Sequence, residues 1–292
     1  MKETLKIAIE TALSSKFGST VRISKERGIG GGCINEAACI STTEGDFFVK
    51  WNDAKKFPSM FYTELKGLKL LKDAQAIKIP DVILQSQVEG ISFLILEFVS
   101  SASMKPDFWE EFGRSLAQLH RQSHSEFGLD HDNYIGSLLQ FNEPKSSWTE
   151  FFIEMRLEKQ IQLALDSGKI SNAHLKMFDS LFNQFQNLMP DEKPALLHGD
   201  LWSGNYMVDE NGTPCIFDPA IYFGHREMDL AMTALFGGFD AKLYESYNEA
   251  FPLTPGFNER FDICNLYPLM VHVNLFGSGY LGSVERILDR FG

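Results

Sequence analysis

Residues 198–218 read HGDLWSGNYMVDENGTPCIFD, and this stretch determines how the rest of the chain is interpreted. Its Asn211-Gly212 dipeptide is the strongest short signal for a β-hairpin, and apolar residues lie on both sides of it. A two-residue turn there would place Asn205 opposite Asp218, with Cβ atoms about 5 Å apart. An amide oxygen and a carboxylate at that separation are able to bind one Mg²⁺ ion. The stretch therefore predicts a hairpin that carries a metal site.

A third polar residue, Asp200, precedes Asn205 with the spacing D-x-x-x-x-N. This spacing resembles the catalytic loop of protein kinases, with DPA at 218–220 where that family has DFG. By that resemblance Asp200 accepts the proton of the attacking hydroxyl, and Asn205 and Asp218 hold Mg²⁺ on the phosphates of ATP. The alternative is a surface hairpin whose acidic residues only cap turns. Pro214 is able to shift the register, because it donates no hydrogen bond to a strand ladder.

The composition predicts a folded protein of two lobes with no nucleic-acid partner. The chain has 292 residues, of which 44% are hydrophobic, and its formal net charge is -12. A nucleic-acid partner would require a basic surface. The cysteines form no Cys-x-x-Cys pair, which argues against a zinc site and favours a reducing, cytoplasmic compartment. Residues 1–18 predict an amphipathic helix rather than a signal peptide, and no apolar run is long enough to span a membrane.

A glycine-rich segment at 28–33 lies between two predicted strands. The backbone of such a loop can approach a ligand closely, so the amides of Gly30, Gly31 and Gly32 are candidates for covering phosphates. A structural hairpin explains the pattern equally well. The segment lacks the GxxxxGK[ST] pattern, which excludes a P-loop.

A lysine and a glutamate occupy positions where the sequence pattern predicts apolar side chains. Lys50 shares one face of the predicted strand 47–51 with Phe48, because side chains alternate along a strand. Glu64 falls inside the apolar stripe of the following predicted helix, and a buried carboxylate requires a cation. We therefore expect Lys50 to pair with Glu64. The alternatives are an edge lysine that points to solvent and a glutamate at the margin of the stripe.

The sequence changes from strand-rich to helix-rich near residue 100, which predicts a bilobal α+β fold. We expect an N-terminal lobe of residues 1–99, with a small antiparallel sheet and a helix, and a larger, mostly helical lobe of residues 100–292. A hairpin of strands 82–84 and 91–99 is predicted to end the first lobe. The helices predicted for the second lobe are 107–121, 148–165, 172–188, 228–236 and 258–291, the last broken near 276–279.

Other polar residues are weaker candidates for a site. Asp229 starts a predicted helix and is suited to brace the catalytic loop through backbone hydrogen bonds, although an ordinary first-turn acid fits equally well. His120 and His124 have an i, i+4 spacing, but no acidic motif accompanies them, which argues against a metal site. His272 and Asn274 are candidates for the wall of a substrate cleft. For His272 alone, a hydrogen-bonded core histidine is the stronger interpretation.

Several motifs together resemble the fructosamine kinase (ketosamine-3-kinase) family, a relative of the choline and aminoglycoside kinases. They occur in the order of that family and span nearly the whole chain. The wider relatives share HGD, the asparagine and the second aspartate, but not LWSGN followed by DPA and the GH-x-E stretch. The matching segments are GGGCINEA at 30–37, FVKWN at 48–52, FYTELKGL at 61–68, HGDLWSGN at 198–205, DPA at 218–220, FGHREMDLAM at 223–232 and LFGGF at 235–239.

The resemblance implies a kinase that uses ATP and Mg²⁺ to phosphorylate the sugar 3-hydroxyl of ketosamines, such as fructosyl-lysine or ribulosyl-lysine. Phosphorylation destabilises the adduct and so promotes deglycation. The alternatives are another small-molecule kinase of the same fold, acting on choline or an aminoglycoside, and an inactive nucleotide-binding regulator. The presence of Lys50, Asp200, Asn205 and Asp218 argues against the regulator.

The resemblance also implies roles for individual residues. Cys33 matches a family position, and we expect it to be oxidisable, with a disulfide between chains that would hold the glycine-rich loop. We expect the protein to be a monomer or a homodimer. The implied roles are Asp200 as the catalytic base, Asn205 and Asp218 as metal ligands, Lys50 with Glu64 at the phosphates, Glu97, Phe98 and Val99 facing adenine, and Trp202 and His272 at the sugar.

Overall fold

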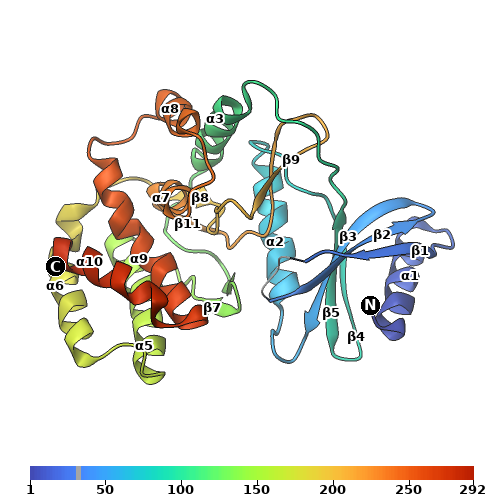
Figure 1. Cartoon of the computed structure of the whole chain (residues 1–292), viewed down its shortest axis with the longest axis horizontal. Helices are drawn as coiled ribbons and strands as arrows, with labels where there is room; N and C mark the ends of the chain where they lie inside the picture. Colours follow the sequence, from blue (N-terminus) through green and yellow to red (C-terminus); the bar gives the residue numbers. More distant parts are fainter. Residues whose placement is uncertain (31–33) are drawn as a thin grey trace.

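The computed structural model describes residues 1–30 and 34–292. Gly31, Gly32 and Cys33, with the roles expected for them, lie outside the described residues. An antiparallel sheet lies at one end of the molecule and most helices lie at the other, with α2 between them (Figure 1). The bilobal α+β fold predicted from the sequence is confirmed.

The N-terminal sheet has the strand order β1-β2-β3-β5-β4. Alternation along β3 sends Phe47, Val49 and Trp51 into a core shared with α1, and Phe48 packs in the core that contains α2. Lys50 therefore faces the α2 side. The elements are α1 Glu3–Phe17, β1 Ile23–Gly28, β2 Glu36–Thr42, β3 Gly45–Asp53, α2 Met60–Asp73, β4 Val82–Val88 and β5 Ile91–Glu97.

The C-terminal part is mostly helical, and short strand pairs carry its loops. The helices predicted for 107–121, 172–188, 228–236 and 258–291 are present, and the last breaks at a 3₁₀ turn as expected. The elements are α3 Phe108–His120, β6 Asn133–Ile135, β7 Leu138–Gln140, α4 Trp148–Glu150, a π-helix Phe151–Leu157, α5 Glu158–Asp166, α6 Asn172–Leu188, β8 Ala195–Leu197, β9 Tyr206–Val208, β10 Pro214–Ile216, β11 Tyr222–Gly224, α7 Glu227–Leu235, α8 Ala241–Ala250, α9 Phe257–Phe276, a 3₁₀ turn Ser278–Tyr280 and α10 Leu281–Phe291.

The hairpin at the centre of the sequence argument forms, but the predicted two-residue turn is wrong. Strand β9 pairs with β10 so that Val208 faces Pro214, and the amide of Phe217 donates to the carbonyl of Asn205 at 3.1 Å. Asn205 thus lies opposite Phe217, one residue from the predicted register. The cause is Asp209, whose Oδ1 accepts from the amides of Asn211 (2.9 Å) and Thr213 (2.8 Å) and so organises a longer loop.

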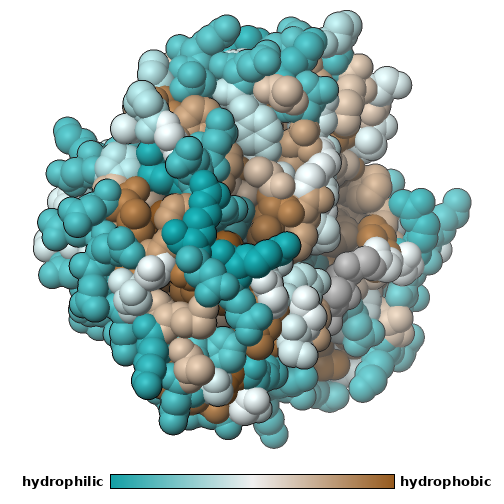
Figure 2. Space-filling view, turned by 60° about the vertical axis from the view of Figure 1, so that its left-hand side comes forward, coloured by the Kyte–Doolittle hydropathy of each residue, from teal (hydrophilic) through white to brown (hydrophobic). Residues whose placement is uncertain are grey.

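The surface agrees with the acidic, charged composition. The face shown in Figure 2 is covered mainly by hydrophilic side chains, and hydrophobic residues show in smaller patches between them.

Within residues 1–30 and 34–292, no helix combines the length and the hydropathy needed to cross a membrane.

Candidate active site

Lys50, Glu64 and Asp218 form a cluster of charges between the sheet and the helical part. Lys50 Nζ lies 2.9 Å from Glu64 Oε1 and 2.8 Å from Asp218 Oδ1. The side chains of Lys50 and Glu64 are only 6% and 10% exposed, which excludes a solvent-facing lysine and a glutamate that reaches water. Burial lowers the pKa of Lys50, but Asp218 and Glu64 together outweigh it and raise that pKa, so the amine is charged.

Asp200 and Asn205 lie beside this cluster, and the side-chain amide of Asn205 links Asp200 to Asp218. Asn205 Nδ2 donates to the Asp200 carbonyl at 2.8 Å and to Asp200 Oδ2 at 3.0 Å, and it lies 3.5 Å from the Asp218 carbonyl. The residues proposed for catalysis and metal binding are therefore neighbours, although the register that was expected to join them is different.

The carboxyl of Asp200 is a weaker acid than an ordinary aspartate. Its partial burial, together with the nearby charge of Asp218, raises its pKa to about 7, and the hydrogen bond from Asn205 opposes this shift. Displaced pKa values are typical of catalytic acids and bases. The electrostatics thus favour Asp200 over the exposed acids of the chain as a proton acceptor.

The open oxygens of Asn205 and Asp218 fit a magnesium ion. The contacts of Asn205 run through Nδ2, which leaves Oδ1 available, and the Asp218 side chain is 40% exposed. In the part of the chain that the structure describes, no group of three or more His, Cys, Asp or Glu could hold a metal. A sparse set of oxygen ligands suits Mg²⁺, which keeps several waters and uses substrate phosphates.

Asp218 has a strained backbone that its surroundings must maintain. Its φ is 55°, in the left-handed region that residues other than glycine rarely adopt. The adjacent catalytic loop is tightly packed against it, since a Cβ on Gly199 would lie 2.0 Å from the Ala220 carbonyl oxygen. The amide of Ala220 also donates to the His198 carbonyl at 2.9 Å. The two segments therefore hold each other in place.

Asp229 braces the catalytic loop, as the sequence suggested. Its carboxylate accepts from the amides of His198 (2.7 Å) and Gly199 (2.9 Å), and it lies 3.2 Å from His120 Nε2. His120 Nδ1 lies 2.8 Å from the hydroxyl of Tyr247. His120 thus supports the loop through Asp229 and is not half of a metal pair with His124. Tyr247 lies on α8, an element absent from the sequence prediction.

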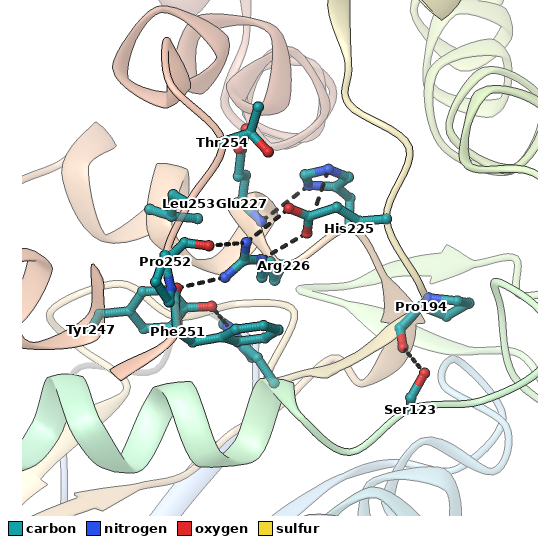
Figure 3. Close-up of polar contacts among 12 residues, drawn as sticks. Ser123, Pro194, His225, Arg226, Glu227, Tyr247, Phe251, Pro252, Leu253 and Thr254 are labelled. Atoms are coloured by element: carbon teal, nitrogen blue, oxygen red, sulfur yellow. Dashed lines mark hydrogen bonds and ion pairs between the residues drawn. The ribbon is translucent and has the colours of Figure 1, made fainter. Parts of the chain in front are cut away.

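The GH-x-E stretch forms a buried ion-pair cluster beside the end of α6 and not a part of the catalytic centre. Arg226 pairs with Glu192 at 2.7 Å and donates to the carbonyls of Phe251 and Pro252, toward which its guanidinium points (Figure 3). Next to it, Arg260 pairs with the fully buried Glu227 through two hydrogen bonds of 2.8 and 2.5 Å. This cluster ties the start of α7, and hence Asp229, to the loops around it.

Glu97, Phe98 and Val99, the hinge segment expected to face adenine, lie at the end of β5 and directly after it. The amide of Glu97 donates to the Asp81 carbonyl at 2.8 Å, and Glu97 Oε2 accepts from the Asp81 amide at 3.0 Å. These contacts engage the Glu97 amide and one of its carboxylate oxygens, and they do not involve the Glu97 carbonyl. Phe98 and Val99 follow the end of β5, and all three residues remain the expected hinge. Gly30 is exposed, and a Cβ there would meet no atom within 4 Å.

Trp202 projects from the catalytic loop with its indole laid over Gly204. A Cβ added to Gly204 would lie 2.3 Å from the indole ring, so the absence of a side chain there permits this placement. Trp202 is 39% exposed. Gly238, in the loop after α7, packs against Ser203, since a Cβ on Gly238 would lie 2.6 Å from that of Ser203. The loop after α7 therefore forms one side of the surface beside Trp202.

His272 lies in an aromatic group beside that loop. Its Nδ1 lies 2.7 Å from the Pro268 carbonyl, and burial lowers its pKa. Its ring centroid is 4.9 Å from those of Phe236 and Tyr280 and 5.4 Å from that of Phe276. Phe236 and Phe276 are both largely exposed. The sequence pointed to His272 but not to these aromatic neighbours, which only the fold brings together.

The sequence of the chain is similar to those of known kinases along nearly its whole length. The fructosamine kinase family model matches residues 5–291. The chain belongs to the fructosamine kinase family. A probable ketoamine kinase of Synechocystis is 38% identical over 97% of this chain and 95% of its own length. The chloroplastic protein-ribulosamine 3-kinase of Oryza sativa subsp. indica is 39% identical over 94% of the chain and 80% of its own length.

Solved structures agree with membership of the fructosamine kinase family. The crystal structure called "Putative fructosamine-3-kinase" of Haemophilus somnus has a TM-score of 0.89 and 29% identity, covering 98% of this chain and 99% of that one. Aminoglycoside phosphotransferase APH(4)-Ia has a TM-score of 0.64 and 15% identity, covering 98% and 99% of the two chains. The second likeness shows that the fold extends beyond the family.

Proposed function

We propose that this fructosamine kinase family member transfers the γ-phosphoryl group of ATP to the sugar 3-hydroxyl of ketosamines, and so promotes deglycation. The observation that carries the proposal is the meeting of Lys50, Asp200, Asn205 and Asp218 in one cluster. Phosphoryl transfer depends on positioning and charge neutralisation more than on covalent chemistry, and this cluster provides both. The relatives named as ketoamine and ribulosamine 3-kinases indicate the acceptor class.

Each member of the cluster has a separate role in the proposal. Asp200 accepts the proton of the attacking hydroxyl, for which its raised pKa suits it. Lys50, held by Glu64, contacts the α- and β-phosphates. Asn205 and Asp218 would hold Mg²⁺, which neutralises charge that develops on the phosphates.

Nucleotide binding and acceptor binding would belong to two different regions of the chain. Residues 1–99 would bind the nucleotide, with Glu97, Phe98 and Val99 at adenine and the glycine-rich loop over the phosphates. Residues 100–292 would supply the catalytic loop and the acceptor site. A mutant of APH(4)-Ia, which has this fold, was crystallised with AMP-PNP and hygromycin B, and this supports the assignment of ATP as the donor.

The acceptor would bind beside the exposed indole of Trp202 and the aromatic group around His272. An exposed aromatic ring next to the catalytic loop suits the apolar face of a sugar. A ketosamine also carries an amine, whose cation is attracted to aromatic rings and to a protein with a net charge of -12.

The test is phosphate transfer from ATP and Mg²⁺ to ribulosyl-lysine, fructosyl-lysine, choline and kanamycin, with the product located by NMR. We expect transfer to the 3-hydroxyl of a ketosamine. Asp200→Asn should reduce kcat by about 10²–10⁴-fold while nucleotide binding persists, because Lys50 and Asp218 remain. The matched control is Asp191→Asn, which alters an exposed acid. Transfer to choline or kanamycin alone, or a wild-type rate in Asp200→Asn, would overturn the proposal.

A further inference from the structure

A buried network of side-chain amides lies behind Asp218, and the proposed reaction leaves it without a role. Its members come from the β6–β7 hairpin, the segment after it, the π-helix and α9. All are at most 5% exposed, so each hydrogen bond among them is shielded from water. The members are Asn133, Gln140, Asn142, Arg156 and Tyr267.

The network ends on the backbone that directly follows Asp218. Gln140 Nε2 donates to the Ala220 carbonyl at 3.0 Å. Asn133 Nδ2 donates to the Ile221 carbonyl at 2.8 Å. The carbonyl of the last DPA residue and that of the residue after it are therefore fixed by side chains from a hairpin more than 75 residues earlier in the chain.

Arg156 sets the orientation of every amide in the network. A guanidinium only donates, and Arg156 Nη2 donates to Asn142 Oδ1 at 2.7 Å, so Asn142 must turn Nδ2 toward Asn133 Oδ1, 3.1 Å away. Asn133 then has only its Nδ2 to offer Ile221. Gln140 Nε2 likewise donates to Asn133 Oδ1 at 2.8 Å, and Gln140 Oε1 accepts the hydroxyl of Tyr267 at 2.8 Å.

The burial of the Arg156 charge costs free energy of folding. Arg156 is fully buried, and no ion pair of the described residues includes it. Its charge is met by carbonyl and amide oxygens and by the ring of Tyr222, whose centroid is 4.0 Å from the guanidinium carbon. It lies on the π-helix Phe151–Leu157, and π-helical turns are frequent at functional sites. Burying a cation without a carboxylate partner costs free energy, so the retention of Arg156 points to a role other than stability.

The strain at Asp218 supplies the reason for such a brace. A residue other than glycine in the left-handed region is strained and persists only where its surroundings fix it. Pro219 follows directly, and it further restricts the backbone of Asp218. The conformation directs Asp218 Oδ1 to Lys50.

The same hairpin also contacts the chain that leads into α2. Tyr134, between Asn133 and Ile135, donates its hydroxyl to the Pro58 carbonyl at 3.0 Å. Figure 1 shows β7 between α9 and α2, at the boundary of the two halves. The hairpin thus contacts both the segment of Asp218 and the start of the helix that carries Glu64.

We propose that Gln140 and Asn133, oriented by Arg156 through Asn142, are positioning residues that hold the segment 218–221 in the conformation in which Asp218 binds the metal. This rests on the proposed function for the metal role, but not for the brace itself. Supporting groups behind metal ligands typically change metal affinity by 10–100-fold when removed.

The test uses Gln140→Met, which keeps the size of the side chain and removes both hydrogen-bonding groups. Tyr267→Phe is the milder second variant, because it removes only the hydroxyl that donates to Gln140 Oε1. The matched control is Asn265→Leu, a buried amide that donates to the Ala231 carbonyl at 3.0 Å and not to the DPA segment. Two quantities are measured: hydrogen exchange of residues 217–224 in the metal-free protein, and Mn²⁺ affinity by EPR with a non-hydrolysable ATP analogue.

We expect faster exchange at 217–224 and Mn²⁺ affinity lowered by about 10-fold or more in Gln140→Met, a smaller change in Tyr267→Phe and none in Asn265→Leu. The KM for the ketosamine should stay within about twofold, because the acceptor wall is untouched. Unchanged exchange at 217–224 in both network variants would overturn the brace. Faster exchange with unchanged Mn²⁺ affinity would overturn the positioning of Asp218, and a wild-type rate in Asp218→Asn would instead refute its metal role.

Discussion

Two buried basic side chains in this protein have opposite charge states, and their neighbours explain the difference. Lys50 contacts two carboxylates, which keep it charged. His225 is fully buried, and burial lowers its pKa to about 4, with the charges of Arg226 and Arg260 acting in the same direction and Glu192 opposing. His225 is therefore neutral at pH 7 in the folded state.

The lowered pKa of His225 predicts that the folded protein loses stability in mild acid. This pKa falls from 6.5 in the unfolded chain to about 4 in the folded one, so between these values the unfolded state binds the extra proton. Stability is complete above pH 6.5 and declines as pH falls toward 4, by about 2 kcal/mol at pH 5. Urea unfolding at pH 7.5 and pH 5 should show a shallower decline in His225→Asn than in wild type. The control is the exposed His124→Asn. Equal slopes in all three proteins would contradict the prediction.

At the scale of elements, the catalytic loop and the β9–β10 hairpin act as one unit. Asn205 ends the loop and Asp218 follows the hairpin, so the length and register of the hairpin decide how far apart they lie. The loop also presents Trp202, whose indole rests on Gly204. Under the proposed function, a change at Gly204 would therefore affect the acceptor side without direct contact to the residues proposed to bind phosphate.

Gly204→Ala should impair use of the ketosamine more than use of ATP. Gly204 does not have a positive φ, so the effect comes from the indole that an added Cβ would meet at 2.3 Å. We expect kcat/KM for the ketosamine to fall by about 10–100-fold, since small misplacements of a positioning group have effects of this size, with KM for ATP near wild type. Gly282→Ala is the control, because a Cβ there meets nothing within 4 Å. Parallel losses for both substrates would argue against this role of Trp202.

The sequence predicted the long elements and the charged cluster, but not the elements that tertiary contacts create. Helix α8 has few apolar residues, and it packs on α3 where a Cβ on Gly113 would lie 2.2 Å from the Leu243 carbonyl. The β6 and β7 strands are three residues each, too short for an alternating pattern. The hairpin register depended on the carboxylate of Asp209, whose capping of the loop outweighs the Asn-Gly preference.

At the scale of the whole molecule, charge and packing connect the two halves. The larger core includes Phe61 and Leu68 of α2 together with residues of the C-terminal helices. The ion pair of Lys50 with Asp218 joins residues 168 positions apart. That long-range contact was predictable only through the resemblance to kinases, because nothing local in either segment indicates the other.

The ion pair across the halves makes ligand-induced stabilisation a test of how they work together. An ATP analogue with Mg²⁺ at about 100 times its Kd should stabilise the wild type by about 2.7 kcal/mol. Lys50→Met should lose most of this gain, because it removes the cation for the phosphates. It should also destabilise the free protein by about 3–5 kcal/mol, since Glu64 and Asp218 are left without their partner. Thermal unfolding with and without ligand measures both effects, and Lys55→Met, at an exposed position, is the control. A full ligand-induced gain in Lys50→Met would show that nucleotide binding does not depend on this pair.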